Sequence, residues 1–197
     1  RAFPVAATAH RERMADKPEV LATRTVAQSR LFEIQEVDLR FANGTEVCFE
    51  KLLNRGYGAV LVVPVIAPGR VLLVREYGAG VDRYELQLPK GRVEAGEDLL
   101  AAANRELREE VGYAAGRLER IRGLTVAPGY LGHTTSIILA RDLAPDPLPG
   151  DEPEQPEVVE WGLDDLAGLV ARDDCTEART IAALYMVRDR LANEENA

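Results

Sequence analysis

Apolar and polar residues follow two recurring spacings along the chain. Alternating or continuous apolar runs predict strands, whereas apolar residues three and four positions apart predict helices. Asn43–Gly44 and Pro68–Gly69 separate neighbouring apolar runs, which predicts tight turns between adjacent strands. The expected strands are Leu31–Phe41, Glu46–Leu53, Gly58–Ile66, Arg70–Glu76, Tyr84–Leu88, Leu118–Val126, Thr134–Arg141 and Val158–Trp161.

Three segments have helical spacing. In the first, an apolar stripe begins at Leu99 and ends at Val111, and Gly112 follows as a stop signal. Two further helices are expected at Leu163–Ala171 and Glu177–Leu191. The chain has no internal repeats, and strands and helices are interspersed, so the pattern favours an α+β fold with a mixed sheet between helices.

The first helix carries three carboxylates on one face. Glu106 and Glu110 are four residues apart, and Glu109 is three residues after Glu106, so their side chains are neighbours. Three like charges this close repel one another, and a hard divalent cation with oxygen ligands would relieve the repulsion. A solvated acidic face is the alternative, but the glycine loop and Glu97 upstream favour a metal site.

Composition narrows the function classes. The 197 residues predict one domain with at most a small appendage, and 46% hydrophobic residues can form a core. A net charge of −9 argues against a binder of nucleic acid polymers, and no apolar run is long enough to span a membrane. Cys48 and Cys175 have no metal-ligand spacing, so we interpret them as reduced thiols of a cytoplasmic protein.

Residues 1–24 are set apart as an N-terminal extension. Met14 is the first methionine, so residues 1–13 are either an added leader or an upstream extension, with Met14 as the native start. They do not resemble a secretory signal. The expected division is 1–24 as extension, 25–57 as N-terminal strands that dimerise, and 58–197 as the main domain.

The loop and helix together resemble the signature of the Nudix hydrolases. That signature is Gly, five residues, Glu, seven residues, then Arg-Glu-apolar-x-Glu-Glu-x-Gly-apolar, and an aliphatic residue is commoner than tyrosine at its last position. The resemblance implies a Nudix-type α/β/α sandwich, with an additional N-terminal β-hairpin, that binds Mg²⁺ or Mn²⁺ and hydrolyses a nucleoside diphosphate linked to another group. The matching residues are Gly91, Glu97, Arg105, Glu106, Leu107, Glu109, Glu110, Gly112 and Tyr113.

Outside this signature, the chain resembles the ADP-ribose pyrophosphatase branch, and within it the bacterial ADP-compounds hydrolases. The branch has a proline about fifteen residues past the signature, and Pro128 lies fifteen after Tyr113. The resemblance implies substrates such as ADP-ribose, diadenosine oligophosphates and NADH, with Arg75, Pro128 and Tyr130 in contact with them. Many members carry a second arginine where this chain has Gly78, which weakens the case for strict ADP-ribose specificity. Other stretches that carry the likeness are Ser29–Phe32, Val37–Leu39, Phe41–Gly44, Val74–Tyr77, Tyr84–Leu86, Ala127–Tyr130, Gly150–Glu154 and Glu177–Arg179.

The same resemblance assigns the metal ligands. Glu106, Glu109 and Glu110 are the expected side-chain ligands, and the backbone carbonyl of Lys90 is a further one. We expect Gly91 to let the loop turn, so that this carbonyl can face the metal.

Other charged residues have two open roles each. Arg105 and Glu97 are expected to form an ion pair that braces the helix, with contact to substrate as the alternative. Arg75 is expected either to contact phosphate or to form a structural salt bridge.

The catalytic base is left open. In the branch, a glutamate from a late loop often deprotonates the attacking water, and the matching loop here is 150–156. Glu152 is the first candidate and Glu154 the second, with a signature glutamate such as Glu109 as the remaining one. A solvated acidic loop is the alternative interpretation.

The sequence thus predicts a metal-dependent pyrophosphatase that cuts the P–O–P bond of ADP-linked compounds. The alternatives are a sugar-nucleotide pyrophosphatase of the same superfamily and a Nudix module that senses a ligand without cutting it. All signature carboxylates are present, which favours an enzyme. In the resembling enzymes the N-terminal strands pack between two subunits, so a homodimer is expected.

Overall fold

The computed structural model describes residues 16–53, 56–150 and 153–195. The chain divides into two compact units, Arg1–Leu53 and Asn54–Ala197, each with its own sheet. No helix in these described ranges is both long enough and apolar enough to cross a bilayer.

The first unit is a three-stranded antiparallel sheet in the order β1 (Glu19–Gln28), β2 (Glu33–Arg40), β3 (Glu46–Leu52). The predicted hairpin is confirmed as β2 and β3, and Gly44 has a positive φ of 82° in the turn between them. Sequence analysis missed β1, which begins within the range set apart as an extension. Two register shifts, at Val20/Ala22 and Thr25/Ala27, interrupt the two-residue alternation that would have indicated a strand.

The two faces of this small sheet differ in character. Val20 pairs with Leu39, Leu39 with Val47, and Val37 with Phe49, so these apolar side chains share one face. The opposite face is charged, and Arg24 there forms ion pairs of 2.6 Å with both Glu36 and Asp38. Val47 and Phe49 are 39% and 42% exposed.

The second unit contains a seven-stranded mixed sheet with the main strand order β10-β5-β4-β9-β8. β6 pairs with β5 and β7 pairs with β4, and among the described strands only β4 and β9 run parallel. This confirms the mixed sheet that the sequence predicted. Its strands are β4 (Ala59–Ala67), β5 (Arg70–Gly78), β6 (Arg83–Gln87), β7 (Lys90–Arg92), β8 (Tyr113–Thr125), β9 (Thr134–Pro145) and β10 (Glu157–Gly162).

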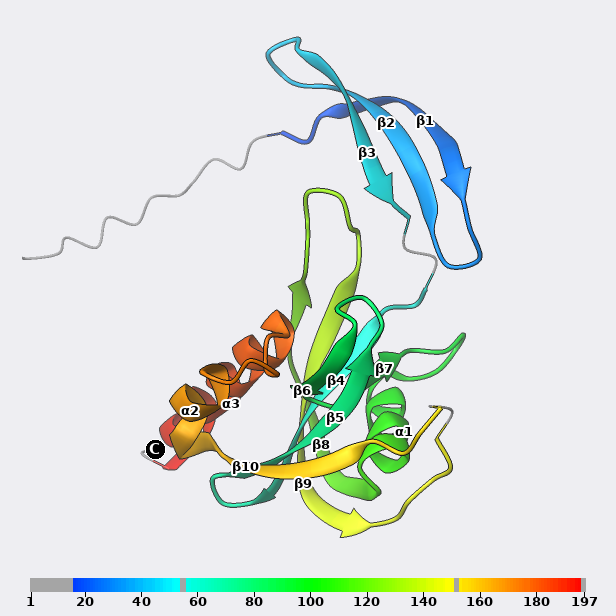
Figure 1. The fold of residues 1–197 in the computed structure, drawn as a ribbon. Coiled ribbons are helices and arrows are strands. Elements are labelled where there is room, and N and C mark those ends of the chain that lie inside the picture. Colours follow the sequence, from blue (N-terminus) through cyan, green and yellow to red (C-terminus); the bar gives the residue numbers. More distant parts are fainter. Residues whose placement is uncertain (1–15, 54–55, 151–152, 196–197) are drawn as a thin grey trace, which may run out of the picture. The chain divides into compact units, whose positions relative to one another are not determined.

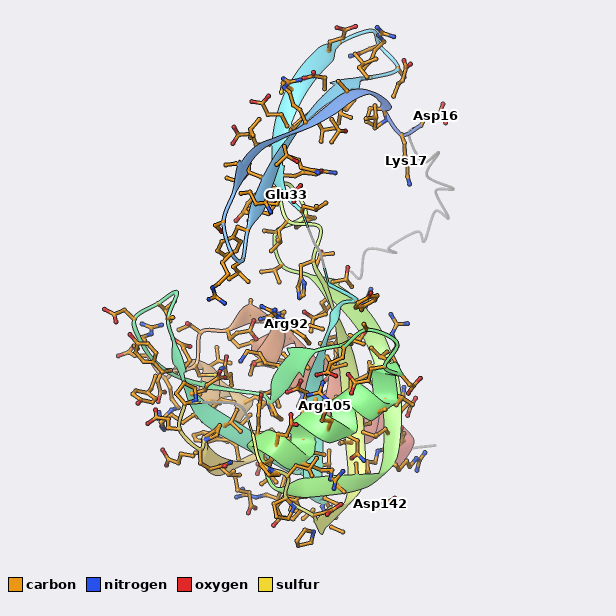
Figure 2. All side chains as sticks on the ribbon, turned by 90° about the vertical axis from the view of Figure 1, so that its right-hand side faces the viewer. Asp16, Lys17, Glu33, Arg92, Arg105 and Asp142 are labelled. Atoms are coloured by element: carbon orange, nitrogen blue, oxygen red, sulfur yellow. The ribbon has the colours of Figure 1, made fainter. Side chains whose placement is uncertain are left out.

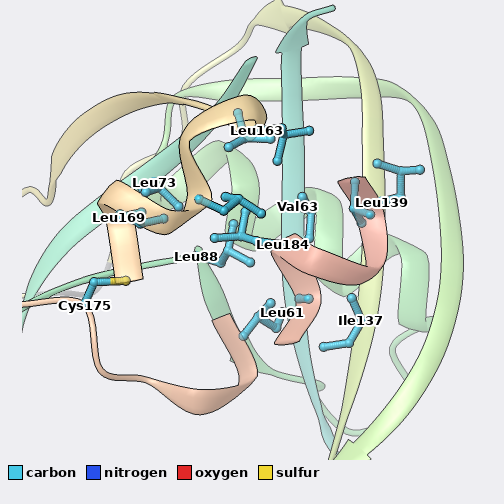
Figure 3. Packing of buried hydrophobic residues seen from close by; sticks show 14 of the residues in the cluster. Leu61, Val63, Leu73, Leu88, Ile137, Leu139, Leu163, Leu169, Cys175 and Leu184 are labelled. Atoms are coloured by element: carbon cyan, nitrogen blue, oxygen red, sulfur yellow. The ribbon is translucent and has the colours of Figure 1, made fainter. Parts of the chain in front are cut away.

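Helices cover both faces of this sheet (Figure 1). α1 (Leu99–Glu110) packs on one face, and a 3₁₀ turn (Leu163–Asp165) with α2 (Leu166–Val170) and α3 (Ala178–Glu195) covers the other. Central strand residues alternate between the two resulting cores, which is why the strands read as continuous apolar runs. Figure 3 shows Leu61 and Val63 of β4 among side chains of the α3 layer, whereas Val60 and Val62 pack in the α1 layer.

Two local features differ from the expectation. The helix expected at Leu163–Ala171 is divided, because Asp165 has non-helical backbone angles (φ −114°, ψ 43°) and its side chain caps α2 by accepting from the N–H of Gly168 at 3.1 Å. The short strand β7 was not expected. It pairs with β4 (Ala59 opposite Arg92) and holds the start of the signature loop against the sheet.

Candidate active site

α1 is fixed at both ends and along one side. The Asp98 side chain accepts from the N–H groups of Leu100 (2.9 Å) and Ala101 (3.2 Å), and is therefore an N-cap. Gly112, with φ 82°, ends the helix. The apolar stripe packs as predicted, with Leu107 fully buried and Val111 beside it in the α1 core. The carboxylate face is thereby held in one orientation.

Arg105 connects several carboxylates of the signature; Figure 2 labels it on α1. It donates to Glu97 at 2.9 and 3.1 Å, which confirms the predicted ion pair. One guanidinium nitrogen also donates to Glu106 (2.8 Å) and Glu109 (3.0 Å), and another to the carbonyl oxygen of Arg92 (3.0 Å). Arg105 therefore joins the loop and the helix, and it balances part of their negative charge.

The reason that sequence analysis gave for Gly91 is wrong. Gly91 lies in β7, and its φ is not among the positive values found at other glycines of the described chain. A Cβ at this position would instead lie 2.0 Å from the Glu106 carboxylate. The glycine therefore lets the Glu106 carboxylate approach the backbone closely, and any side chain at this position would have to displace that carboxylate.

Glu106 and Glu110 are both buried, with 9% and 6% of their surface exposed. Glu110 accepts from the backbone N–H of Lys90 at 3.2 Å. Burial raises the pKa of Glu110 to about 8; nearby Lys90 opposes this shift, and the charges of Glu76 and Glu106 add to it. The negative charge at this end of α1 is thus poorly compensated by the protein itself.

The loop between β9 and β10 wraps around the C-terminal end of α1. The N–H of Asp146 donates to the carbonyl of Gly112 at 3.0 Å, and the N–H of Leu148 donates to that of Arg108 at 3.1 Å. Further along, Gln155 donates from its side chain to the carbonyl of Glu109 at 3.3 Å. These contacts bring a later segment of the chain to the helix carboxylates.

A cavity of about 40 Å³ lies between the loop and α1. Glu106, Glu109, Glu110 and Glu154 line it, together with Gly150, Gln155 and Pro156. Such a volume holds only a few water molecules or a partly hydrated ion. The structure thus brings Glu154 together with the three predicted ligands, whereas Glu152, the first candidate for the base, lies outside the described residues.

Carboxylate oxygens are the donors that Mg²⁺ and Mn²⁺ prefer, so this lining fits a divalent cation in its chemistry. Among the described residues, no three such side chains are arranged closely enough to hold an ion as they stand. Glu106, Glu109, Glu110 and the Lys90 carbonyl remain the predicted ligands.

A second cavity of about 430 Å³ adjoins the first and shares Glu154 and Pro156 with it. Its size falls within the range of small-molecule sites. Arg75, Glu76, Tyr77, Ala79, Tyr84 and Pro153 form the rest of the lining.

Two tyrosines of this second cavity were missed by sequence analysis. The rings of Tyr77 and Tyr84 meet edge to face at 5.6 Å between centroids. They are direct cross-strand partners in β5 and β6. The signal was partly available: Tyr77 directly follows the expected strand Arg70–Glu76, and extending that strand by one residue in a hairpin with Tyr84–Leu88 would have placed the two rings together.

Arg75 lines the second cavity and also forms structural ion pairs. Its guanidinium contacts Glu157 at 3.0 Å and makes a second, close contact with Asp174. The Arg172 and Arg75 guanidinium groups hold the pKa of Asp174 well below its usual range, against the opposing effect of burial. The structural alternative for Arg75 is thus confirmed, and a phosphate contact stays a prediction.

Pro128 and Tyr130 lie apart from both cavities. They belong to the loop between β8 and β9, and Tyr130 is 57% exposed. Neither residue lines the two cavities described above. Their contact with substrate stays a prediction.

Comparisons with known proteins agree with this geometry. The NUDIX domain model matches residues 57–184, and the model of the NudE-type Nudix hydrolase N-terminal domain matches residues 18–51. The chain therefore belongs to the Nudix family, and it is a Nudix hydrolase.

Individual relatives cover nearly the whole chain. ADP compounds hydrolase NudE of Escherichia coli (strain K12) is 41% identical, over 90% of this chain and 95% of that protein. ADP-ribose pyrophosphatase of Bacillus subtilis (strain 168) is 30% identical, over 85% of this chain and 94% of that protein. A crystal structure of an ADP compounds hydrolase has a TM-score of 0.85 and 40% identity, and the match covers 93% of this chain and 98% of that one.

Proposed function

We propose that this chain is a metal-dependent pyrophosphatase that cuts the P–O–P bond of ADP-linked compounds. AMP and the phosphorylated other half of the substrate would be the products. The names of its relatives in Escherichia coli and Bacillus subtilis support an ADP-linked substrate.

One observation carries the proposal. A small cavity lined by four carboxylates opens beside a larger one with room for an organic group. A divalent cation needs the first environment, and a nucleoside or sugar fits the second. The substrate would place its diphosphate at the junction, where both cavities share Glu154.

The cation we propose is Mg²⁺, with Mn²⁺ as an alternative. Glu106, Glu109, Glu110 and the Lys90 carbonyl would hold it, and once bound it would neutralise phosphoryl oxygens and make water more acidic. Arg105 would keep Glu106 and Glu109 aligned through its hydrogen bonds of 2.8 and 3.0 Å. Gly91 would keep the approach to Glu106 free of a side chain.

For the general base we propose a glutamate of the late loop. Glu154 is the described candidate, because it lines the same cavity as the three helix carboxylates. Glu152 stays a candidate for the base from sequence alone, and Glu109 is the remaining candidate within the signature. A base of this kind contributes roughly 10²–10⁴-fold to the rate.

A substrate panel with product identification tests the reaction. ADP-ribose should give AMP and ribose 5-phosphate, NADH should give AMP and reduced nicotinamide mononucleotide, and diadenosine oligophosphates should give AMP plus the remaining nucleotide. Chelation of divalent ions should abolish the activity, and Mg²⁺ or Mn²⁺ should restore it.

Two outcomes would contradict the proposal. Cleavage of non-adenine sugar nucleotides in preference to every ADP-linked compound would indicate a sugar-nucleotide pyrophosphatase; Gly78, in place of the arginine of many relatives, is the feature that leaves this open. Full activity without divalent ions would contradict the proposed metal site.

We also propose a homodimer with a closed two-fold interface formed through the N-terminal sheet. The apolar face of Val20, Leu39, Val47 and Phe49 is the surface expected to contact the second copy. Sedimentation at micromolar concentration should give twice the chain mass of 21.6 kDa. Val47→Glu should give the monomer, whereas Glu50→Gln elsewhere on β3 should not; a wild-type protein that sediments as a monomer refutes the proposal.

A cytoplasmic location is proposed from the thiols. Cys48 and Cys175 are both free, and Cys48 is exposed, which is usual in a reducing compartment. Fractionation of cells that express the protein should recover it with cytoplasmic markers.

A further inference from the structure

The carboxylate of Glu154 is shared by both cavities, and a tyrosine holds it. The hydroxyl of Tyr84 donates a hydrogen bond to Glu154, which lines the cavity of the helix carboxylates on one side and the larger cavity on the other. The two residues lie 70 positions apart in sequence. None of the roles considered above uses this contact.

The tyrosine is held more firmly than the glutamate. Tyr84 lies in β6, which pairs with β5 over five residue pairs, and its ring rests edge-on against Tyr77. The hydroxyl of Tyr77 in turn donates to Asp82 in the turn between the strands. Glu154 lies instead in the loop that leads to β10, so a strand residue orients a loop residue.

We propose that Tyr84 is a positioning residue that holds Glu154 at the junction of the two cavities, ready to accept a proton from the attacking water. This inference rests on the proposed function and names a further residue in the same site. One carboxylate oxygen would accept from the phenol, which leaves the other free to face the small cavity.

The protonation of the phenol agrees with this role. The hydrogen bond to Glu154 raises the pKa of Tyr84 above its ordinary value. The hydroxyl therefore keeps its proton at neutral pH and remains a donor.

Tyr84→Phe tests the inference, because it removes the hydroxyl and keeps the ring against Tyr77. We expect kcat to fall about tenfold with KM within about twofold, as for a group that acts in the transition state. The matched control is Tyr185→Phe on α3, which packs against the α3-side core and lines neither of the two cavities, and which should keep wild-type kinetics.

A double-mutant cycle separates positioning from a general loss of packing. In a Glu154→Gln background, Tyr84→Phe should cause no further loss of kcat, because its effect passes through the Glu154 carboxylate. Additive losses in the cycle would overturn the inference. If the wild type prefers another nucleoside diphosphate derivative, the same cycle is run with that substrate.

Hydrogen exchange gives a readout that does not depend on activity. Backbone amides of the 148–158 peptide should exchange faster in Tyr84→Phe than in the wild type or Tyr185→Phe. Unchanged exchange together with unchanged kcat would show that Tyr84 does not hold the loop.

The outcomes also distinguish this inference from the proposed function. A collapse of turnover in Glu154→Gln with normal turnover in Tyr84→Phe would overturn the role of Tyr84 and leave the proposed function intact. Normal turnover in Glu154→Gln would overturn both the role of Glu154 as base and that of Tyr84, although cleavage of ADP-ribose would still stand.

Discussion

The two faces of the central sheet bury similar aliphatic side chains, but the buried polar groups on the two faces differ in how well their partners stabilise them. On the α3 face, the fully buried Thr180 accepts from the N–H of Leu88 at 3.1 Å. Glu177 accepts from Arg179 and from the N–H of Thr180, both at 2.7 Å. Although burial alone would raise the pKa of Glu177, these partners hold it below its ordinary value.

On the α1 face, the buried carboxylates repel one another. Glu106 and Glu110 lie together, and burial raises the pKa of Glu110 to about 8. Polar groups on the α3 face therefore stabilise the fold, whereas those on the α1 face are retained at a cost in stability. Such a cost marks the α1 face as the place where the chemistry occurs. Removing a buried polar group on the α3 face should therefore lower the free energy of unfolding and leave turnover unchanged. Removing a buried carboxylate on the α1 face should instead lower turnover without lowering the free energy of unfolding.

The largest expected effect is on the α1 face. Glu110→Gln should lower turnover at least ~100-fold, equivalent to about 2.7 kcal/mol of barrier, because a predicted metal ligand is lost. Its free energy of unfolding in chelator should equal or exceed that of the wild type, since a buried like charge is removed.

Steady-state kinetics in Mg²⁺ and urea unfolding measure the two quantities separately. Glu94→Gln, at an exposed carboxylate of the loop between β7 and α1, is the control and should leave both unchanged. A Glu110→Gln enzyme with near wild-type turnover would remove Glu110 from the metal site.

On the α3 face the effect should be on stability. Thr180→Val keeps the shape of the side chain but leaves the buried N–H of Leu88 without its acceptor, and should lower the free energy of unfolding by about 1–3 kcal/mol. Turnover per folded molecule should stay within about twofold. Thr180→Ser keeps the hydroxyl and is the control. If Thr180→Val unfolds like the wild type, the polar groups of this face do not stabilise it as argued.

The N-cap of α1 gives a smaller effect. Asp98→Ala should cost about 1 kcal/mol of stability, because the N–H groups of Leu100 and Ala101 lose their acceptor. Asp98→Asn can still accept both and should cost much less. Thermal unfolding of the three proteins checks the order, and an equal loss in Ala and Asn variants would argue that the charge of Asp98 matters rather than its hydrogen bonds.

The last expected effect is a pH dependence of the metal-free protein. The pKa of Glu110 rises from 4.5 to about 8 on folding, so the folded state binds the proton more tightly. The resulting stabilisation is fully present below the unfolded pKa and is lost as the pH rises through the folded one.

Thermal unfolding in chelator should therefore show wild-type stability falling relative to Glu110→Gln between about pH 5 and about pH 8. Parallel profiles would show that Glu110 does not titrate in this range. Glu94→Gln again serves as the control and should follow the wild type.

Much of the fold could be predicted because its signals are local. The apolar stripe of α1 predicted which side packs, and the continuous apolar runs predicted the central strands β4 and β5. β1 and β7 could not be predicted from such signals. Register shifts interrupt the alternation of β1, and β7 spans only three residues, so its strand conformation depends on its partner β4.

For the site, the sequence by itself determined the contacts that form within one helix or between that helix and the loop next to it. Glu106, Glu109 and Glu110 are neighbours because helical geometry places residues three and four apart on one face. The Glu97–Arg105 pair followed from spacing within one loop and helix, and it is present.

Only the tertiary structure decided what distant segments contribute. It placed Glu154 beside the helix carboxylates and joined it to Tyr84. It also replaced the turn expected at Gly91 with a steric requirement from Glu106. Local spacing cannot encode these contacts, because they arise when the sheet pairs β5 with β6 and the loop before β10 folds over the end of α1.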